Sequence, residues 1–146
     1  MAETGNHFYG TEIEWKGERS LSLAGTGLPV IAAGAPAEFG GREGQWSPEH
    51  LLVGSLNACY MLTLLTIAEN SKINIVSFSS SAQGKLEKVS GAGYQITEIL
   101  VKPKLVLSSS NDLVRMPRII DKAKENCFIS NSIKADIKIE PEVSHQ

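Results

Sequence analysis

The sequence is short of cysteine, of aromatic residues and of net charge. Two of its 146 residues are cysteine, 6% are aromatic, and 14 basic side chains stand against 16 acidic ones, for a formal net charge of −2. This balance excludes the strongly basic surface typical of nucleic-acid binding, so no nucleic-acid partner is expected. Because 42% of the residues are hydrophobic, a chain of this length can bury a core without disulfides, which excludes disordered chains and disulfide scaffolds.

Targeting and cofactor signals are also missing. The N-terminus has no basic segment followed by an apolar one, so it does not resemble a secretory signal. We therefore expect a cytoplasmic protein, in a compartment where structural disulfides are uncommon. Of the three histidines, His7 and His145 lie near the termini and His50 stands apart from both, so no metal site is expected. No cofactor is expected either.

One segment approaches the length of a membrane span. Residues 51–68 carry no charged side chain, and a bilayer crossing needs about 20 apolar residues. Several polar or small residues lower its hydrophobicity, and no Lys/Arg bias flanks it. We expect no membrane partner. A helix that is apolar on nearly all sides must instead be covered, either at the centre of a domain or at a subunit interface.

The first half of the chain predicts a hairpin, a loop and a long helix. Imperfect alternation of apolar and polar residues over 9–23 predicts two strands with a turn near 16–18. Frequent Gly and Pro over 28–45 allow one short strand around Val30, followed by a loop. Ser47-Pro48-Glu49 is a typical helix start, and the helix should run to about Asn70.

The second half predicts strands, a helix and a final strand. Strand patterns cover 73–88 and 94–107, and apolar residues at spacings of three and four then lead to Cys127. Pro117 means that this helix either bends there or begins its regular part there. A last strand alternates over 135–140. The element order predicts one α+β domain, residues 1–146, with mainly antiparallel sheet.

The two cysteines are candidates for chemistry. Cys59 lies in the middle of the first helix and Cys127 at the end of the second, 68 positions apart, which is neither a CxxC redox motif nor a common zinc pattern. Both lie on helix faces predicted to be buried, and two such helices are expected to pack on each other. The two thiols then meet inside the core, or each simply fills it as a small hydrophobic residue.

Two longer motifs surround these cysteines. Residues 46–64, WSPEHLLVGSLNACYMLTL, resemble the OsmC/Ohr family motif, a Ser/Asn-Pro-Glu-x-Leu helix start with a Cys ten residues after the Glu. Residues 123–133, AKENCFISNSI, are similar to the second cysteine motif of the same family, the osmotically inducible and organic hydroperoxide resistance proteins. The order of elements agrees from about Tyr9 to Glu140.

The resemblance implies a fold and an activity. It implies an OsmC-like intertwined homodimer with antiparallel sheets wrapped around two long central helices. It also implies a thiol-dependent peroxidase that reduces organic or fatty-acid hydroperoxides to alcohols. Carried over, Cys59 would attack the O–O bond and become a sulfenic acid, Cys127 would resolve it as a disulfide, and an external dithiol reductant would restore both thiols.

The resemblance also implies an activating cation. Burial raises the pKa of a cysteine, and a nearby Arg or His can reverse this. Peroxidase members of the family use an Arg held by a Glu, and Glu49 matches that Glu. It lies about 15 Å of helix rise from Cys59, so it would act through a long Arg or from the other subunit. Arg42 and Arg19 are the candidates, and the position of Arg42 near the helix start favours it.

One departure supports a second hypothesis. Phe128 follows Cys127, where many family members have proline. An OsmC-like protein without efficient turnover, acting as a stress-related thiol sensor or a hydrophobic-ligand binder, is therefore the alternative. A purely structural dimer is a third possibility. The sequence does not determine which hydroperoxide or which reductant is used.

Overall fold

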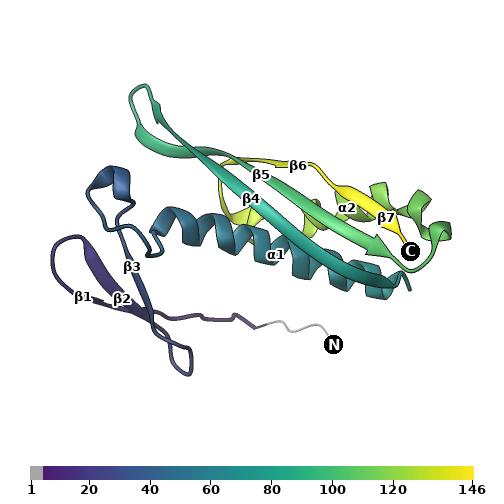
Figure 1. Ribbon diagram of the computed structural model, residues 1–146, viewed down its shortest axis with the longest axis horizontal. Coiled ribbons are helices and arrows are strands. Elements are labelled where there is room, and N and C mark those ends of the chain that lie inside the picture. Colours follow the sequence, from purple (N-terminus) through teal and green to yellow (C-terminus); the bar gives the residue numbers. More distant parts are fainter. Residues whose placement is uncertain (1–4) are drawn as a thin grey trace. The chain divides into compact units, whose positions relative to one another are not determined.

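The computed structural model describes residues 5–146, and the chain divides into two compact units, Met1–Pro48 and Glu49–Gln146 (Figure 1). The elements follow the order of strands and helices that the sequence predicts, with one further strand at the C-terminus. In chain order they are β1 (Glu12–Trp15), β2 (Ser20–Ala24), β3 (Ile31–Gly34), a 3-10 helix (Ala37–Phe39), α1 (Pro48–Asn70), β4 (Ile75–Val89), β5 (Gly93–Leu107), a 3-10 helix (Ser110–Arg115), α2 (Met116–Asn126), a 3-10 helix (Ser130–Ser132), β6 (Asp136–Ile139) and β7 (Glu142–His145).

The N-terminal unit is a three-stranded antiparallel sheet in the order β1-β2-β3. The predicted hairpin is confirmed, and its turn is closed by the Lys16 N–H, which donates to the Ser20 carbonyl at 2.9 Å. Gly17 takes a φ of 97°, a left-handed conformation that glycine adopts without steric cost. The strand expected around Val30 begins one residue later, at Ile31.

Helix α1 belongs to the C-terminal unit and starts and ends where the sequence predicts. Pro48 is its first residue and Glu49 lies in its first turn, where the helix dipole favours a carboxylate. One face is fully buried, formed by residues four apart: Leu56, Tyr60, Leu64 and Ala68. The rest of the helix is more open, and Leu62 is 63% exposed. The full coverage that the sequence predicts is therefore not reached within this unit.

The composition of α1 also meets the criteria for a membrane span. Its most apolar window has a mean hydropathy of 1.8, and 22% of that window is buried. Core helices of soluble proteins pass the same test, so one such helix is weak support for a membrane location.

The sheet of the C-terminal unit is built around the β4–β5 hairpin. The sequence patterns predict both strands, and the two pair antiparallel over almost their whole length. Strands β6 and β7 both pair with β5 in parallel, which corrects the expectation of antiparallel sheets for this part of the fold. The physical reason is the connection: a helix between two strands returns the chain to the same end of the sheet, and such a crossover produces a parallel pair.

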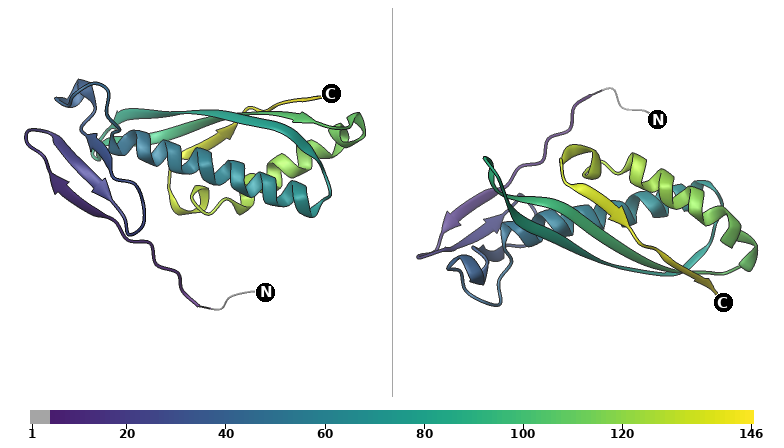
Figure 2. Two further views of the ribbon diagram at one scale, coloured as in Figure 1. Left: turned by 60° about the horizontal axis from the view of Figure 1, so that its bottom comes forward. Right: turned by 90° about the horizontal axis from the view of Figure 1, so that it is seen from above.

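Helix α2 begins at Met116, after a 3-10 helix whose start is capped by Ser109. Of the two alternatives for Pro117, the second is correct: the regular helix begins there, because proline lacks an N–H and is tolerated in the first turn. Buried residues of α1, α2 and β5 form one hydrophobic core, with both helices on the same face of the sheet (Figure 2).

Candidate functional site: a thiol pair beside an open groove

Two hydrogen bonds hold α1 and α2 side by side. The Tyr60 hydroxyl donates to the Ile120 carbonyl at 3.1 Å, and burial raises the pKa of this phenol. At the other end of the pair, the Arg115 guanidinium donates to the Ser71 carbonyl at 2.7 Å. The start of α2 is thereby fixed near the end of α1. The two helices run antiparallel, which brings the end of α2 to the middle of α1.

The two cysteines meet at this point. Cys59 projects from the middle of α1 and is half-buried, while Cys127 caps the end of α2 and is fully buried. Both thiols are free, and each lies within hydrogen-bonding reach of the other. The interpretation in which the thiols meet is confirmed, and Cys127 is at the same time part of the hydrophobic core.

Several hydrogen bonds favour the thiolate form of Cys59. Burial raises the pKa of this thiol, but the backbone N–H of Ile129, the Cys127 thiol, the Thr63 hydroxyl and the backbone N–H of Phe128 together bring the pKa below its usual value. The Thr63 oxygen lies 3.9 Å from the Cys59 sulfur and donates to the Cys59 carbonyl at 2.7 Å. Within the described residues, no charged side chain is among these causes.

Cys127 is shifted in the opposite direction. Burial raises the pKa of its thiol, and the neighbouring Cys59 raises it further, against the backbone N–H groups of Ser130 and Ile129. The Asn131 N–H donates to the Cys127 carbonyl at 3.0 Å, which fixes the chain as it leaves α2. Of the two thiols, Cys59 is therefore the one that ionises first and the better nucleophile near neutral pH.

An open groove runs beside Cys59. Its volume is about 710 Å³, and it lies between one face of α1 and the end of α2. Its lining is largely apolar, and it includes Phe128, which is 80% exposed. The lining residues are Ser55, Ala58, Cys59, Leu62, Thr63, Thr66, Ile67, Asn70, Lys122, Asn126, Phe128 and Ile129.

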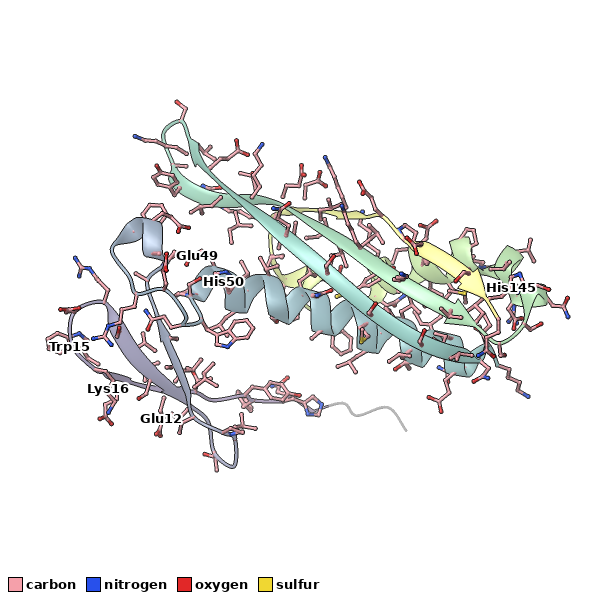
Figure 3. All side chains as sticks on the ribbon, viewed as in Figure 1. Glu12, Trp15, Lys16, Glu49, His50 and His145 are labelled. Carbon is pink, nitrogen blue, oxygen red and sulfur yellow. The ribbon has the colours of Figure 1, made fainter. Side chains whose placement is uncertain are left out.

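The three other residues singled out from the sequence lie elsewhere. Glu49 is in the first turn of α1, next to His50 (Figure 3), and its buried Oε1 has no hydrogen-bond partner among the described residues. Arg19 and Arg42 are exposed residues of the N-terminal unit, in the β1–β2 turn and in the loop before α1. Neither guanidinium forms an ion pair with another described residue. The catalytic roles of these three residues stay predictions.

Sequence reasoning missed the groups that surround the Cys59 sulfur. Thr63 follows Cys59 by one helical turn, so the i, i+4 spacing could have pointed to it. The N–H groups of Phe128 and Ile129 carry no side-chain signal, and only the packing of α2 on α1 places them at the sulfur. Among residues 5–146, no group of three or more His, Cys, Asp or Glu side chains is arranged to hold a metal ion.

The site is a thiol pair on two helices that cover one face of a sheet. Comparison with known proteins shows which family this chain resembles. Residues 40–142 match the family described as OsmC-like protein. A relative from Escherichia coli named Peroxiredoxin OsmC is 30% identical over 125 residues, covering 86% of this chain and 85% of its own. An uncharacterized Bacillus subtilis protein, YmaD, is 24% identical over 95% of this chain and 94% of its own.

A solved structure agrees in fold. An OsmC-like protein of unknown function from Vibrio cholerae superimposes with a TM-score of 0.86 at 25% identity, covering 93% of this chain and 99% of that one. The chain therefore belongs to the OsmC-like family, as its two cysteine motifs predict. Its fold is the α+β fold of that family, and the family includes proteins named as peroxiredoxins.

Proposed function

We propose that the protein is a thiol-dependent peroxidase that reduces organic or fatty-acid hydroperoxides to alcohols. The observation that carries this proposal is that Cys59 and Cys127 lie near each other beside an open, largely apolar groove. The named peroxiredoxin at 30% identity supports it. The pKa values of the two thiols shift in opposite directions, which supports a nucleophilic role for Cys59 and a resolving role for Cys127.

The reaction consists of two displacements and a reduction. The Cys59 thiolate attacks the distal peroxide oxygen, the O–O bond breaks, and the alkoxide leaves and takes up a proton as the alcohol. Cys59 is now a sulfenic acid. The Cys127 sulfur attacks the Cys59 sulfur, an S–S bond forms, and water leaves with the proton of the Cys127 thiol. An external dithiol supplies two electrons and two protons to restore both thiols.

Backbone groups assist the first step. The N–H groups of Phe128 and Ile129 point to the Cys59 sulfur and stabilise negative charge there. Because these residues directly follow Cys127, the same turn that activates Cys59 also holds its resolving partner in place. The pair can then form a disulfide without a large rearrangement of either helix.

Glu49 and an arginine complete the proposed active site. The buried, unpartnered Oε1 of Glu49 is a suitable acceptor for a guanidinium. Arg42 is our first choice for this partner and Arg19 the second, from this chain or from a second copy. An Arg held by Glu49 would further favour the thiolate of Cys59.

A homodimer, intertwined around the central helices, is part of the proposal. Gly54, Met61 and Leu65 lie on a third face of α1, and Leu65 is 37% exposed. A second copy of α1 would cover this face and satisfy the expectation that the helix is buried on all sides. The 93% coverage of the chain in the Vibrio cholerae match supports a single OsmC-like domain over residues 1–146. A cytoplasmic location agrees with two free thiols.

The proposal is tested by oxidation and turnover. One equivalent of cumene hydroperoxide should remove the mass of two hydrogen atoms from the wild type by forming the Cys59–Cys127 disulfide, whereas Cys127→Ser should gain one oxygen. With dithiothreitol in excess, the wild type should consume the hydroperoxide and Cys59→Ser should not. Equal rates for the wild type and Cys59→Ser would rule out the peroxidase.

The second candidate is an OsmC-like protein without efficient turnover, acting as a thiol sensor or hydrophobic-ligand binder. The exposed Phe128 beside the cysteine pair favours it, because an apolar side chain at the rim of a groove suits ligand capture. For the sensor, one equivalent of hydroperoxide forms the disulfide but steady consumption with a dithiol does not follow, and for the ligand binder neither occurs. The same two measurements therefore separate the two candidates.

A further inference from the structure

The groove beside Cys59 has a mainly apolar lining with a single charged side chain. Its walls are mainly apolar, with Leu62, Ile67, Phe128 and Ile129 among them. Among its lining residues, Lys122 is the only one with a charged side chain. An apolar channel with one cation suits a ligand that is apolar along its length and carries one negative charge.

Lys122 stands at a defined distance from the reacting sulfur. It precedes Cys127 by five residues on α2, about 7.5 Å of helix rise. Since Cys127 contacts Cys59 and α2 runs antiparallel to α1, Lys122 lies toward the end of the groove that contains Asn70. The ammonium and the thiol pair are therefore separated along the groove, whose lining also includes the apolar Leu62 and Ile67.

The Lys122 ammonium is available to a ligand. It is exposed and forms no ion pair with a described residue, although Asp121 and Glu125 are near it in sequence on α2. Some other lysines of this unit do have carboxylate partners: Lys104 pairs with Glu142 at 3.6 Å and Lys138 with Glu98 at 2.9 Å.

We propose that Lys122 determines substrate specificity by binding the carboxylate of an amphiphilic hydroperoxide whose chain lies in the groove and whose O–O bond reaches Cys59. This inference rests on the proposed peroxidase function and assigns it a substrate-positioning residue. A carboxylate accepts charge-assisted hydrogen bonds from the ammonium, and the apolar walls bind the chain. An ester of the same hydroperoxide keeps the apolar contacts and loses the ionic one.

The kinetic test compares a fatty-acid hydroperoxide with its methyl ester. For Lys122→Gln, the KM for the acid should rise about fivefold, in line with a partly exposed ion pair, while kcat and all constants for the ester stay unchanged. Lys124→Gln is the matched control, because Lys124 is also exposed on α2 but faces a different cavity, lined by Ile139 and Val143. Salt should reduce the preference of the wild type for the acid.

Two results would overturn the inference: an unchanged KM for the acid in Lys122→Gln, or equal changes for acid and ester. A binding measurement distinguishes failure of the Lys122 proposal from failure of the peroxidase proposal. Laurate, which cannot react, should slow alkylation of Cys59 by N-ethylmaleimide in the wild type and in Lys124→Gln, and less so in Lys122→Gln. If no hydroperoxide is consumed but this pattern holds, the anchoring role stands and the peroxidase does not. Equal protection of all three proteins refutes the anchor.

Discussion

The Tyr60 hydroxyl on α1 donates a hydrogen bond of 3.1 Å to the carbonyl of Ile120 on α2. Tyr60 is the neighbour of Cys59, and Ile120 lies two turns before Cys127 on the helix that ends there. This bond joins two buried residues and sets the two helices in the alignment in which their thiols meet.

Tyr60→Phe should reduce the free energy of unfolding by about 1 kcal/mol, because it removes this hydrogen bond and leaves the packing of the ring unchanged. Urea denaturation followed by circular dichroism measures the change. Tyr9→Phe is the control, since Tyr9 is 91% exposed and should tolerate the substitution. A second effect should accompany the loss: slower disulfide formation between Cys59 and Cys127. Unchanged stability and unchanged disulfide formation would contradict this alignment role.

The pH dependence of alkylation should report the lowered pKa of Cys59. Burial raises that pKa, but hydrogen bonds from the Ile129 N–H, Cys127 and other donors outweigh it, so the thiolate forms at lower pH than in a free cysteine, about pH 8.5. Alkylation of Cys59 should therefore reach half its maximal rate at a lower pH than alkylation of a cysteine in an unfolded peptide measured under the same conditions. Cys127→Ala removes one donor and should move the midpoint upward, whereas Cys127→Ser keeps a donor and should move it less.

The hydrogen bonds that lower the pKa of Cys59 also predict how the stability of the fold changes with pH. Because the pKa of Cys59 is lower in the folded than in the unfolded protein, its thiolate adds stability above the unfolded pKa, and this contribution is lost as the pH falls through the folded pKa. Cys127 has a raised pKa and loses its contribution as the pH rises. In Cys127→Ser, which keeps a hydrogen-bond donor to Cys59 and removes the titration of Cys127, stability from pH 7 to 9 should rise more steeply than in the wild type. A less steep rise than in the wild type would contradict the opposite pKa shifts of Cys59 and Cys127.

Thr63 should tune Cys59 through its hydroxyl. Its oxygen lies 3.9 Å from the sulfur, and its single proton, donated to the Cys59 carbonyl at 2.7 Å, lowers the pKa of Cys59 when it turns to the thiolate, against the burial that raises this pKa. Thr63→Val should shift the alkylation midpoint of Cys59 to higher pH, because valine has a similar shape and no hydroxyl. Thr63→Ser keeps the hydroxyl and should leave the midpoint near that of the wild type. Equal alkylation midpoints for Thr63→Val and Thr63→Ser would exclude this effect of the Thr63 hydroxyl on the pKa of Cys59.

Strand β4 approaches α1 closely at Gly84, so a side chain at this position should be destabilising. A Cβ added there would lie 2.6 Å from Cγ2 of Val53, which is stiff because valine is branched at Cβ. Gly84→Ala should cost about 1 to 3 kcal/mol of stability through overpacking. The cost should be smaller in a Val53→Ala background, and a double-mutant cycle measures this coupling. Equal costs in both backgrounds would place the strain elsewhere.

Much of the fold could be predicted from local patterns in the sequence. Ser47-Pro48-Glu49 marks the start of α1, and alternation marks β4 and β5, because capping, helix dipole and side-chain period act within a few residues. Pairing partners depend on long-range contacts. For this reason the parallel pairing of β6 with β5, and the presence of β7, came only from the structure.

The candidate site divides in the same way. The sequence by itself determined the two candidates for the chemistry, because Cys59 and Cys127 are the only two cysteines and each lies in a segment that resembles a family motif. Tertiary structure decided that they meet, that the N–H groups of Phe128 and Ile129 face the Cys59 sulfur, and that Lys122 borders the same groove. Backbone donors and a lone lysine leave no periodic or compositional signal. Only the packing of α2 against α1 brings the two cysteines of this chain together as a thiol pair.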